Sequence, residues 1–211
     1  MGTVILIYLI AGALYLLILY RLIKSNPASE VKNSRVTASD ISKEILLPEE
    51  IRLLYHTPCG NDVVKRAFLF ATQTGLRKVD IKAITWGMIS QDGNLTVRQS
   101  KTERRNIIPL NDNARMLMGD ERAPYELIFP ITISDTAVNK LLNTWVKRAG
   151  IKKHITFHCA RHSHGTNILA ATGNLKLTSS LLGHTSTKYT ERYTRILDTM
   201  KKEAVEKLAK L

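Results

Sequence analysis

A single stretch near the C-terminus, Thr156 to Ile196, carries side chains whose types and spacing suit chemistry on a phosphate group. If its first part is helical, His158 and Arg161 lie three residues apart on one face, where two hydrogen-bond donors can meet one anion. Phosphate is the natural anion for an arginine fork, and a phenol such as Tyr193 can act as a covalent nucleophile toward phosphorus. Completed by His184, this pattern indicates phosphoryl transfer.

Two basic residues earlier in the chain could join the same site. Arg77 follows a glycine in TGLRKVD, where the end of one helix is expected to meet the start of the next. Lys101 lies in SKTERRNIIPL at the expected tip of a hairpin, from which its ammonium could reach into a groove. Each residue is ordinary by itself, because basic side chains in loops are mostly solvated. Arg77 and Lys101 become candidates for the site only in combination with the other residues of the pattern.

The chain is strongly basic, with 31 Lys and Arg against 18 Asp and Glu and a formal charge of +13. Such a balance is typical of proteins that bind nucleic acid, although it also keeps other proteins soluble. The 211 residues suffice for one catalytic domain of about 150 to 170 residues and an appendage. The cysteines, Cys59 and Cys159, form neither a Cys-x-x-Cys pair nor a disulfide framework, which favours a reducing compartment.

The N-terminal segment Val4–Tyr20 contains no charged residue. As a helix it would be about 26 Å long, close to the roughly 30 Å of a bilayer core. Arg21 and Lys24 follow it and predict that the rest of the chain stays in the cytoplasm, tethered to the inner face of the membrane. The alternative is a hydrophobic helix buried against a partner protein. Residues 1–24 are therefore assigned to a hydrophobic, membrane-spanning or protein-bound helix.

Residues 25–44 are polar and contain Pro27, so we expect a linker there and a folded catalytic domain over residues 45–211. Start and stop signals predict that this domain is mainly helical. The expected helices are a short one opened by Pro48, then Val63–Thr74 with Asp62 as cap, Val79–Thr85, Asp112–Met118, Ser134–Ala149, His158–Ala171, Lys176–Leu182, Lys188–Arg195 and Leu197–Leu208.

Between the helices, the period of the apolar residues changes to two. Met88–Ser90, Asn94–Gln99 and Arg105–Ile108 therefore read as three short strands, joined by an Asp-Gly turn and by a basic hairpin tip. The predicted fold class is α+β: mainly α-helical with a small three-stranded antiparallel sheet.

In order and spacing, the candidate residues resemble the catalytic motifs of the tyrosine recombinases, the phage-integrase family. TGLRKVD resembles the first arginine box, SKTERRNIIPL the lysine hairpin, HCARH the His-x-x-Arg-His box, and LLGHTSTKYTERYT the Leu-Gly-His and nucleophile segment. The resemblance covers about residues 45–200 and fills all six catalytic positions. It implies a DNA breaking-rejoining catalytic domain and a DNA strand transferase that performs site-specific recombination in the manner of an integrase.

The resemblance also implies a role for each basic group. Arg77 and Arg161 would clamp the non-bridging oxygens of the scissile phosphate, where negative charge grows in the transition state. His158 and His184 would add hydrogen bonds to the same group or help to move the tyrosine proton. Lys101 would give a proton to the departing 5′ oxygen.

Tyr193 would attack phosphorus and form a 3′-phosphotyrosyl link. This link keeps the phosphoester for rejoining, so neither a metal nor another cofactor is called for. Tyr189 is a competing phenol four residues earlier. The family places its nucleophile nine residues after the Leu-Gly-His histidine, His184, which selects Tyr193.

A metal site is the competing interpretation of the histidines. His158 and His162 have the i,i+4 spacing of helical ligands, and His164 lies close by. No glutamate follows His158 as in zinc proteases, and Arg161 between them would repel a cation. We interpret His162 as a packing or supporting residue, and Asp80 as an acid that orients an arginine.

The chain differs from the family at its N-terminus, where relatives usually carry a helical domain that closes a clamp around DNA. We therefore expect a membrane-tethered recombinase that acts on double-stranded DNA. The alternative is a membrane-anchored or truncated DNA-binding relative that no longer recombines, and a nuclease or type IB topoisomerase would use related chemistry. The C-terminal helix, which docks on a neighbouring protomer in many relatives, implies a DNA-bound homo-oligomer.

Overall fold

The computed structural model describes residues 10, 45–98, 105–184, 187 and 190–206. The chain divides into two units, Met1–Val36 and Thr37–Leu211, and the elements below belong to the second. In the described part, no helix is both long and apolar enough to cross a membrane. The predicted membrane helix at Val4–Tyr20 lies outside the described residues apart from Ile10, as does the predicted linker, so both stay predictions.

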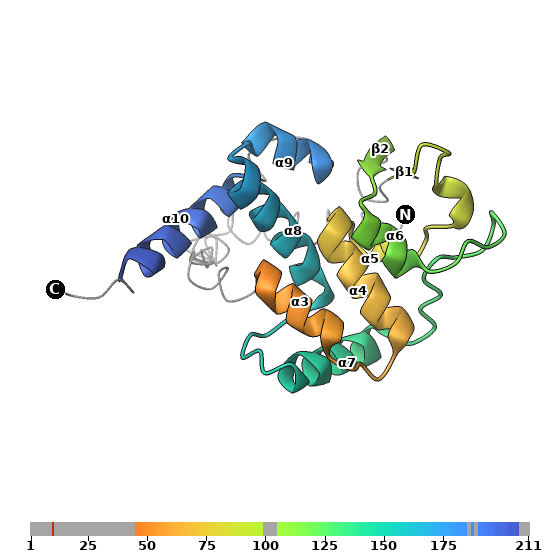
Figure 1. The fold of residues 1–211 in the computed structure, drawn as a ribbon, viewed down its shortest axis with the longest axis horizontal. Helices are drawn as coiled ribbons and strands as arrows, with labels where there is room; N and C mark the ends of the chain where they lie inside the picture. The colour runs from red at the N-terminus through yellow and green to blue at the C-terminus, as the bar shows by residue number, and fades with distance from the viewer. Residues whose placement is uncertain (1–9, 11–44, 99–104, 185–186, 188–189, 207–211) are drawn as a thin grey trace. The chain divides into compact units, whose positions relative to one another are not determined.

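Two helices, α4 (Asp62–Thr74) and α8 (Phe157–Thr172), lie side by side and form the centre of the fold (Figure 1). α4 is capped by Asn61, whose side chain accepts a hydrogen bond from the backbone N–H of Val64, so the predicted cap, Asp62, is instead the first helical residue. Gly75 ends α4 with a φ of 67°, a conformation that favours glycine. Six consecutive residues of α4, 67–72, are buried, as expected of a helix surrounded by core.

Helices α3 (Pro48–His56), α6 (Asp112–Met118) and α7 (Asp135–Arg148) cover this centre. Phe68 of α4 makes edge-on contacts with Trp145 of α7 and Phe157 of α8, with ring centroids 5.8 and 5.6 Å apart. The indole Nε1 of Trp145 donates to the carbonyl of Thr57, which ties α7 to the end of α3. These buried aromatic contacts give α8 a rigid support.

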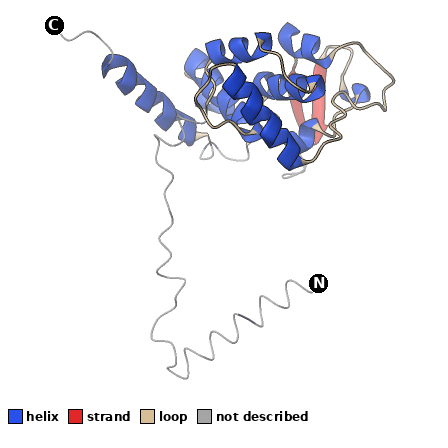
Figure 2. Cartoon of the chain, turned by 90° about the horizontal axis from the view of Figure 1, so that it is seen from below, coloured by secondary structure: helices blue, strands red, loops and turns tan. Residues whose placement is uncertain are grey.

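The described residues form a two-stranded antiparallel sheet of β1 (Asn94–Arg98) and β2 (Arg105–Pro109), red in Figure 2. The predicted third strand, Met88–Ser90, is wrong. Met88 ends a 3-10 helix, η2 (Trp86–Met88), and the backbone N–H of Ser90 already donates to Asn94 across a tight turn. Only Ile89 is left to pair, and it makes an isolated bridge to Leu95.

The remaining helices are α5 (Lys78–Ile81), α9 (Leu175–Leu181) and α10 (Glu191–Glu206). The sequence predicted two C-terminal helices, whereas α10 is continuous, because no glycine or proline interrupts it and Tyr193 and Ile196 are buried on one face. α10 packs against α8. Its C-terminal part projects away from the other helices in both views (Figures 1 and 2).

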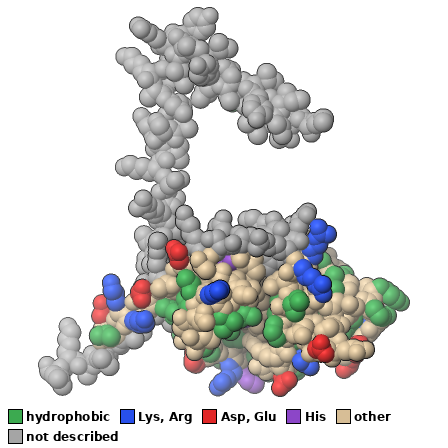
Figure 3. Space-filling model, turned by 90° about the horizontal axis from the view of Figure 1, so that it is seen from above, with side chains coloured by type: hydrophobic (Ala, Val, Ile, Leu, Met, Phe, Trp, Pro, Cys, Tyr) green, Lys and Arg blue, Asp and Glu red, His purple; other side chains and the backbone are tan. Residues whose placement is uncertain are grey.

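The surface carries mixed charge. Figure 3 shows one face on which Lys and Arg side chains occur at several separate places, among hydrophobic and acidic ones. Among the side chains drawn in colour on this face, the positive charge is therefore not gathered into one block.

Candidate active site

Arg161 is almost fully buried, with 4% of its surface exposed, and connects three parts of the chain. Its Nη1 donates to the carbonyl of Gly75 (2.6 Å) and its Nη2 to the carbonyl of Leu182 (2.8 Å). α8 supplies the arginine, while the two carbonyls come from the ends of α4 and α9. Arg161 is thus held in one orientation before any ligand binds.

The pKa of Arg161 depends on its burial and on three neighbouring ionisable groups. Burial lowers the pKa of Arg161 to about 10, and the charge of Arg77 acts in the same direction. Tyr193 and Asp80 oppose this lowering of the pKa. Arg161 stays protonated at neutral pH, and it interacts electrostatically with two other predicted site residues.

Arg77 begins α5 as its N-terminal cap residue. Its Nη1 lies 3.9 Å from Oδ2 of Asp80, a carboxylate that is 3% exposed. Asp80 therefore acts on both arginines and offsets part of their mutual repulsion, which agrees with its interpretation as an orienting acid.

Tyr193 lies in the first turn of α10 and is 1% exposed. Its Oη lies 3.3 Å from Nδ1 of His162, and its backbone N–H donates to the carbonyl of Thr190. The ring belongs to a buried apolar cluster with Ile45, Leu169, Leu182 and Ile196. The phenol thus meets a buried imidazole rather than bulk solvent.

His162 is a contact residue of the site, which agrees with its interpretation as a packing or supporting residue. It is 5% exposed and contacts Tyr193, while the ring of His158 stands edge-on to it at 4.4 Å. The i,i+4 spacing of the two histidines was the available signal, but it also fits a metal site. Among the described residues, no three His, Cys, Asp or Glu side chains come together as metal ligands would.

His184 lies between α9 and α10, after Gly183, which has a φ of 62°. Its Nδ1 lies 2.8 Å from the hydroxyl of Thr190, which is fully buried. Thr190 therefore orients the imidazole of His184 and also precedes the helix that carries Tyr193. The sequence offered no signal for this contact.

Lys101 and Tyr189 lie outside the described residues, so their predicted roles stay predictions. The hairpin that should carry Lys101 is nevertheless anchored at the site. Asn106 of β2 donates from its side chain to the carbonyl of Leu181, next to the residue that accepts from Arg161.

Gly165 leaves the space that the Tyr193 ring occupies. A Cβ atom there would lie 2.8 Å from Cζ and 2.9 Å from Cε2 of Tyr193. Overpacking costs about 1–3 kcal/mol, and alanine gains about 1 kcal/mol of helix propensity, so we expect Gly165→Ala to lower the free energy of unfolding by up to about 2 kcal/mol. Urea unfolding measures this change.

Two comparisons isolate the clash at Gly165. Gly60→Ala should be neutral, because its Cβ would meet only Leu141, at 3.9 Å. In a Tyr193→Ala background, Gly165→Ala should destabilise the protein less, because only the contact of its Cβ with Leu182 Cδ1, at 3.1 Å, remains tight. An equal cost in that background would show that the clash is not with Tyr193.

His164 makes the fold sensitive to acid. Its Nδ1 lies 3.0 Å from the carbonyl of Thr72. Burial lowers the pKa of His164 to about 4, the charge of Arg161 acts in the same direction, and the bond to Thr72 opposes both. In the unfolded chain this pKa is about 6.5, so the stability that neutral His164 contributes is full above about pH 6.5 and is lost as pH falls toward about 4.

The expected loss is about 2 kcal/mol between about pH 7 and pH 4.5, measured by urea unfolding. His164→Gln, which cannot titrate, should lose about 2 kcal/mol less than the wild type over this interval. Equal losses in the two proteins would contradict the assignment to His164.

The chain is similar to known proteins over most of its length. Residues 44–200 match the model of the phage integrase family. The tyrosine recombinase XerC of Chlamydia pneumoniae is 25% identical over 209 residues, which cover 88% of this chain and 64% of that protein. The tyrosine recombinase of Thermosipho africanus is 32% identical over 120 residues, which cover 54% and 42%. The chain thus spans less than two thirds of the length of these curated relatives.

Solved structures share the fold at low sequence identity. The XerH site-specific recombinase bound to palindromic difH substrate has a TM-score of 0.64 and 16% identity, over 84% of this chain and 57% of that one. A lambda integrase dimer bound to a COC′ core site has a TM-score of 0.63 and 20% identity, over 87% and 69%. On the family match and this shared fold, the chain belongs to the phage integrase family.

Proposed function

We propose that this chain cleaves and rejoins a strand of double-stranded DNA through a covalent bond between Tyr193 and a 3′ phosphate, as a site-specific recombinase. The observation that carries the proposal is the buried Arg161, fixed by two carbonyls and electrostatically linked to both Arg77 and Tyr193. Two fixed cations and a phenol in one neighbourhood are what phosphoryl transfer to tyrosine needs.

The proposed reaction balances without a cofactor. Tyr193 Oη attacks phosphorus, the bond from phosphorus to the 5′ oxygen breaks, and its electron pair leaves with that oxygen, which takes a proton from Lys101. An imidazole accepts the phenol proton, with His162 already 3.3 Å from Oη and His158 and His184 as the family's candidates. Rejoining reverses these steps.

The arginines stabilise the charge that develops on the phosphate. Each Nη of Arg161 donates one N–H to a backbone carbonyl, which fixes the guanidinium in place. Its other N–H groups can then bind phosphate oxygens. Arg77 would contact the same oxygens.

The wider assignments are proposals as well. We propose that residues 45–211 act on double-stranded DNA in the cytoplasm, that residues 25–44 are a linker, and that Val4–Tyr20 tethers the chain to the membrane. The formal charge of +13 supports DNA binding. The projecting end of α10 supports a DNA-bound homo-oligomer, since it presents exposed residues such as Val205 to a neighbour.

A trapping experiment tests the function. The full chain is incubated with nicked duplexes of randomised core sequence, in which release of a short strand prevents rejoining, and adducts are resolved on a denaturing gel. We expect a covalent adduct whose nucleotide-bearing peptide contains Tyr193. Binding to the duplexes without an adduct would favour the non-recombining alternative, and relaxation of supercoiled plasmid without strand exchange would favour a topoisomerase.

A further inference from the structure

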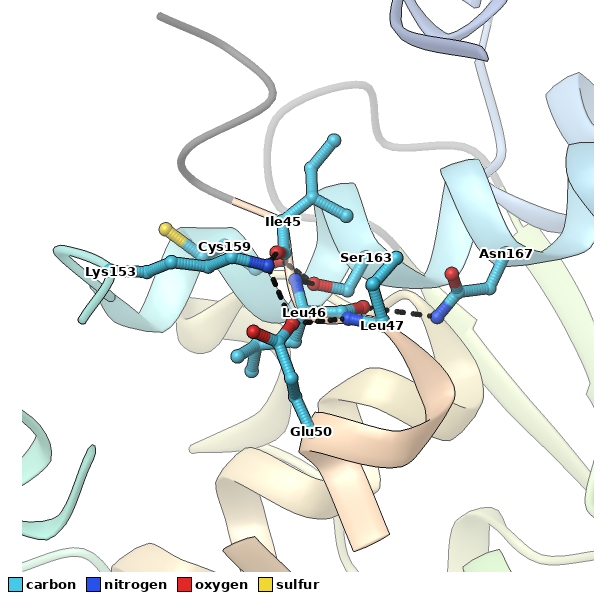
Figure 4. A network of polar contacts seen from close by, with 8 residues as sticks. All are labelled: Ile45, Leu46, Leu47, Glu50, Lys153, Cys159, Ser163 and Asn167. Atoms are coloured by element: carbon cyan, nitrogen blue, oxygen red, sulfur yellow. Dashed lines mark hydrogen bonds and ion pairs between the residues drawn. The ribbon is translucent and has the colours of Figure 1, made fainter. Parts of the chain in front are cut away.

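The first described residues of the catalytic domain, Ile45–Leu47, lie across α8, and we name this segment the strap (Figure 4). The backbone N–H of Leu46 donates to the hydroxyl of Ser163 at 2.9 Å. The side-chain amide of Asn167, one turn further along α8, donates to the carbonyl of Leu46 at 3.2 Å. Both polar groups of the Leu46 backbone are therefore bound to α8.

An ion pair fixes the strap at its two ends. Lys153 donates from Nζ to the carbonyl of Ile45 at 2.7 Å and pairs with Oε2 of Glu50 at 2.6 Å. The same carboxylate accepts from the backbone N–H of Leu47 at 2.7 Å. The two side chains are 25% and 22% exposed, so solvent screens this pair less than a fully exposed one.

The strap also borders the site of Tyr193. Ile45 is 2% exposed and belongs to the buried apolar cluster that contains Tyr193. On α8, His162 contacts the phenol and the next residue, Ser163, binds the strap. The segment that starts the domain and the predicted nucleophile are thus held by consecutive residues of one helix.

Tyr193 cannot reach a phosphate group of a DNA duplex from its position, because it is 1% exposed. Its Oη must leave the cluster before it can attack phosphorus. The contacts that oppose this movement include the one with His162 and the packing of the ring in the cluster, to which Ile45 contributes. Anything that loosens the strap removes part of this resistance.

We propose that the strap is a positioning element that holds Tyr193 in its buried place, so that release of Ile45–Leu47 from α8 makes the phenol available. The importance of this release for cleavage rests on the proposed function. The predicted linker joins the strap at Ile45, so a change in how the linker is held acts directly on the tyrosine site.

Nitration of the full chain by tetranitromethane, followed by peptide mass spectrometry, reports the exposure of Tyr193. Tyr125 and Tyr55, 82% and 40% exposed, serve as internal references. Lys153→Met removes the ammonium but keeps an aliphatic side chain, and Lys153→Arg keeps the donors. Ile45→Ala removes apolar packing and keeps every backbone hydrogen bond.

Asp62→Asn is the matched control, because it removes an ion pair of 2.7 Å with Arg66 that does not involve the strap. We expect Lys153→Met and Ile45→Ala to raise nitration of Tyr193 relative to Tyr125 about threefold to tenfold, the factor that one lost interaction gives a local opening. Lys153→Arg and Asp62→Asn should leave it unchanged. Formation of the covalent DNA adduct should accelerate in the same two variants.

Unchanged nitration of Tyr193 in a folded Lys153→Met variant, or an equal rise in Asp62→Asn, overturns the proposal. If Ile45→Ala does not fold, Lys153→Met and its arginine counterpart decide. Nitration that responds as expected while wild type and variants all lack an adduct rejects the recombinase function and keeps the strap. An adduct in every protein with no response of nitration rejects only the strap.

Discussion

Replacement of Tyr193 by phenylalanine is expected to abolish the covalent DNA adduct, with a loss of at least about 10⁴-fold in the rate of its formation. The substitution removes the attacking oxygen and keeps the ring that fills the cluster with Ile45 and Leu182. The hydrogen bond with His162 is lost while the packing of the ring is kept, so the free energy of unfolding should change by about 1 kcal/mol. The denaturing-gel assay on nicked duplexes measures the adduct, and urea unfolding measures the stability.

Tyr125→Phe is the control for this prediction, since Tyr125 is 82% exposed and lies outside the candidate site. It should form the adduct at the wild-type rate. An adduct of wild-type yield in Tyr193→Phe would transfer the role of nucleophile to another residue, with Tyr189 as the first to test.

Arg161→Lys is expected to slow formation of the adduct by about 10³-fold, although the positive charge is kept. One ammonium cannot replace a planar fork that binds the carbonyls of Gly75 and Leu182 at once. At least one buried carbonyl then lacks a donor, which lowers the free energy of unfolding by about 1–3 kcal/mol. Single-turnover cleavage and urea unfolding measure the two effects.

Arg66→Lys is a matched control, because Arg66 also donates to two backbone carbonyls, those of Leu117 and Met118, away from the candidate site. It should lose stability while its folded fraction forms the adduct at the wild-type rate. If both variants lose cleavage equally, the effect of Arg161→Lys reflects folding rather than contact with phosphate.

The helices could be predicted wherever the chain carries explicit start or stop signals. α6 has the predicted bounds Asp112–Met118, and Ser134, the first residue of the predicted helix Ser134–Ala149, caps α7. The cap of α4 was misplaced by one residue, because Asn61 and Asp62 are both good capping residues and only the backbone geometry distinguishes them. The prediction of a third strand was wrong because the 3-10 helix before Ile89 and the turn after it leave only this residue to pair.

The sequence predicts which residues belong to the candidate site where their spacing along the chain relates them, but not the contacts between helices. Spacing along one helix relates His158 to Arg161, and the motif order adds Arg77, His184 and Tyr193. The contact of His162 with Tyr193 spans 31 residues and joins two helices. Such contacts depend on how helices pack, and no local pattern in a single sequence contains that information.

The contacts of the strap could not be predicted for the same reason, because they join residues that are even further apart in the sequence. Lys153 binds Ile45 and Glu50 across 108 and 103 residues. A lysine after a helix and a glutamate in the first turn of another are common surface features in sequence, since most such residues are solvated. The ion pair of Lys153 and Glu50 becomes visible only when α3 and the segment between α7 and α8 are placed in space.

The anchoring of Arg161 has a consequence for how this chain could change over evolutionary time. Arg161 binds the ends of α4 and α9 to α8, so a descendant that lacked the proposed DNA cleavage would still need this side chain in order to fold. The hydroxyl of Tyr193 contributes less to the fold, because the ring supplies the packing in the apolar cluster. Among such descendants, we therefore expect substitutions of Tyr193 to appear first. Arg161 should be retained because it stabilises the fold, even where it no longer serves catalysis.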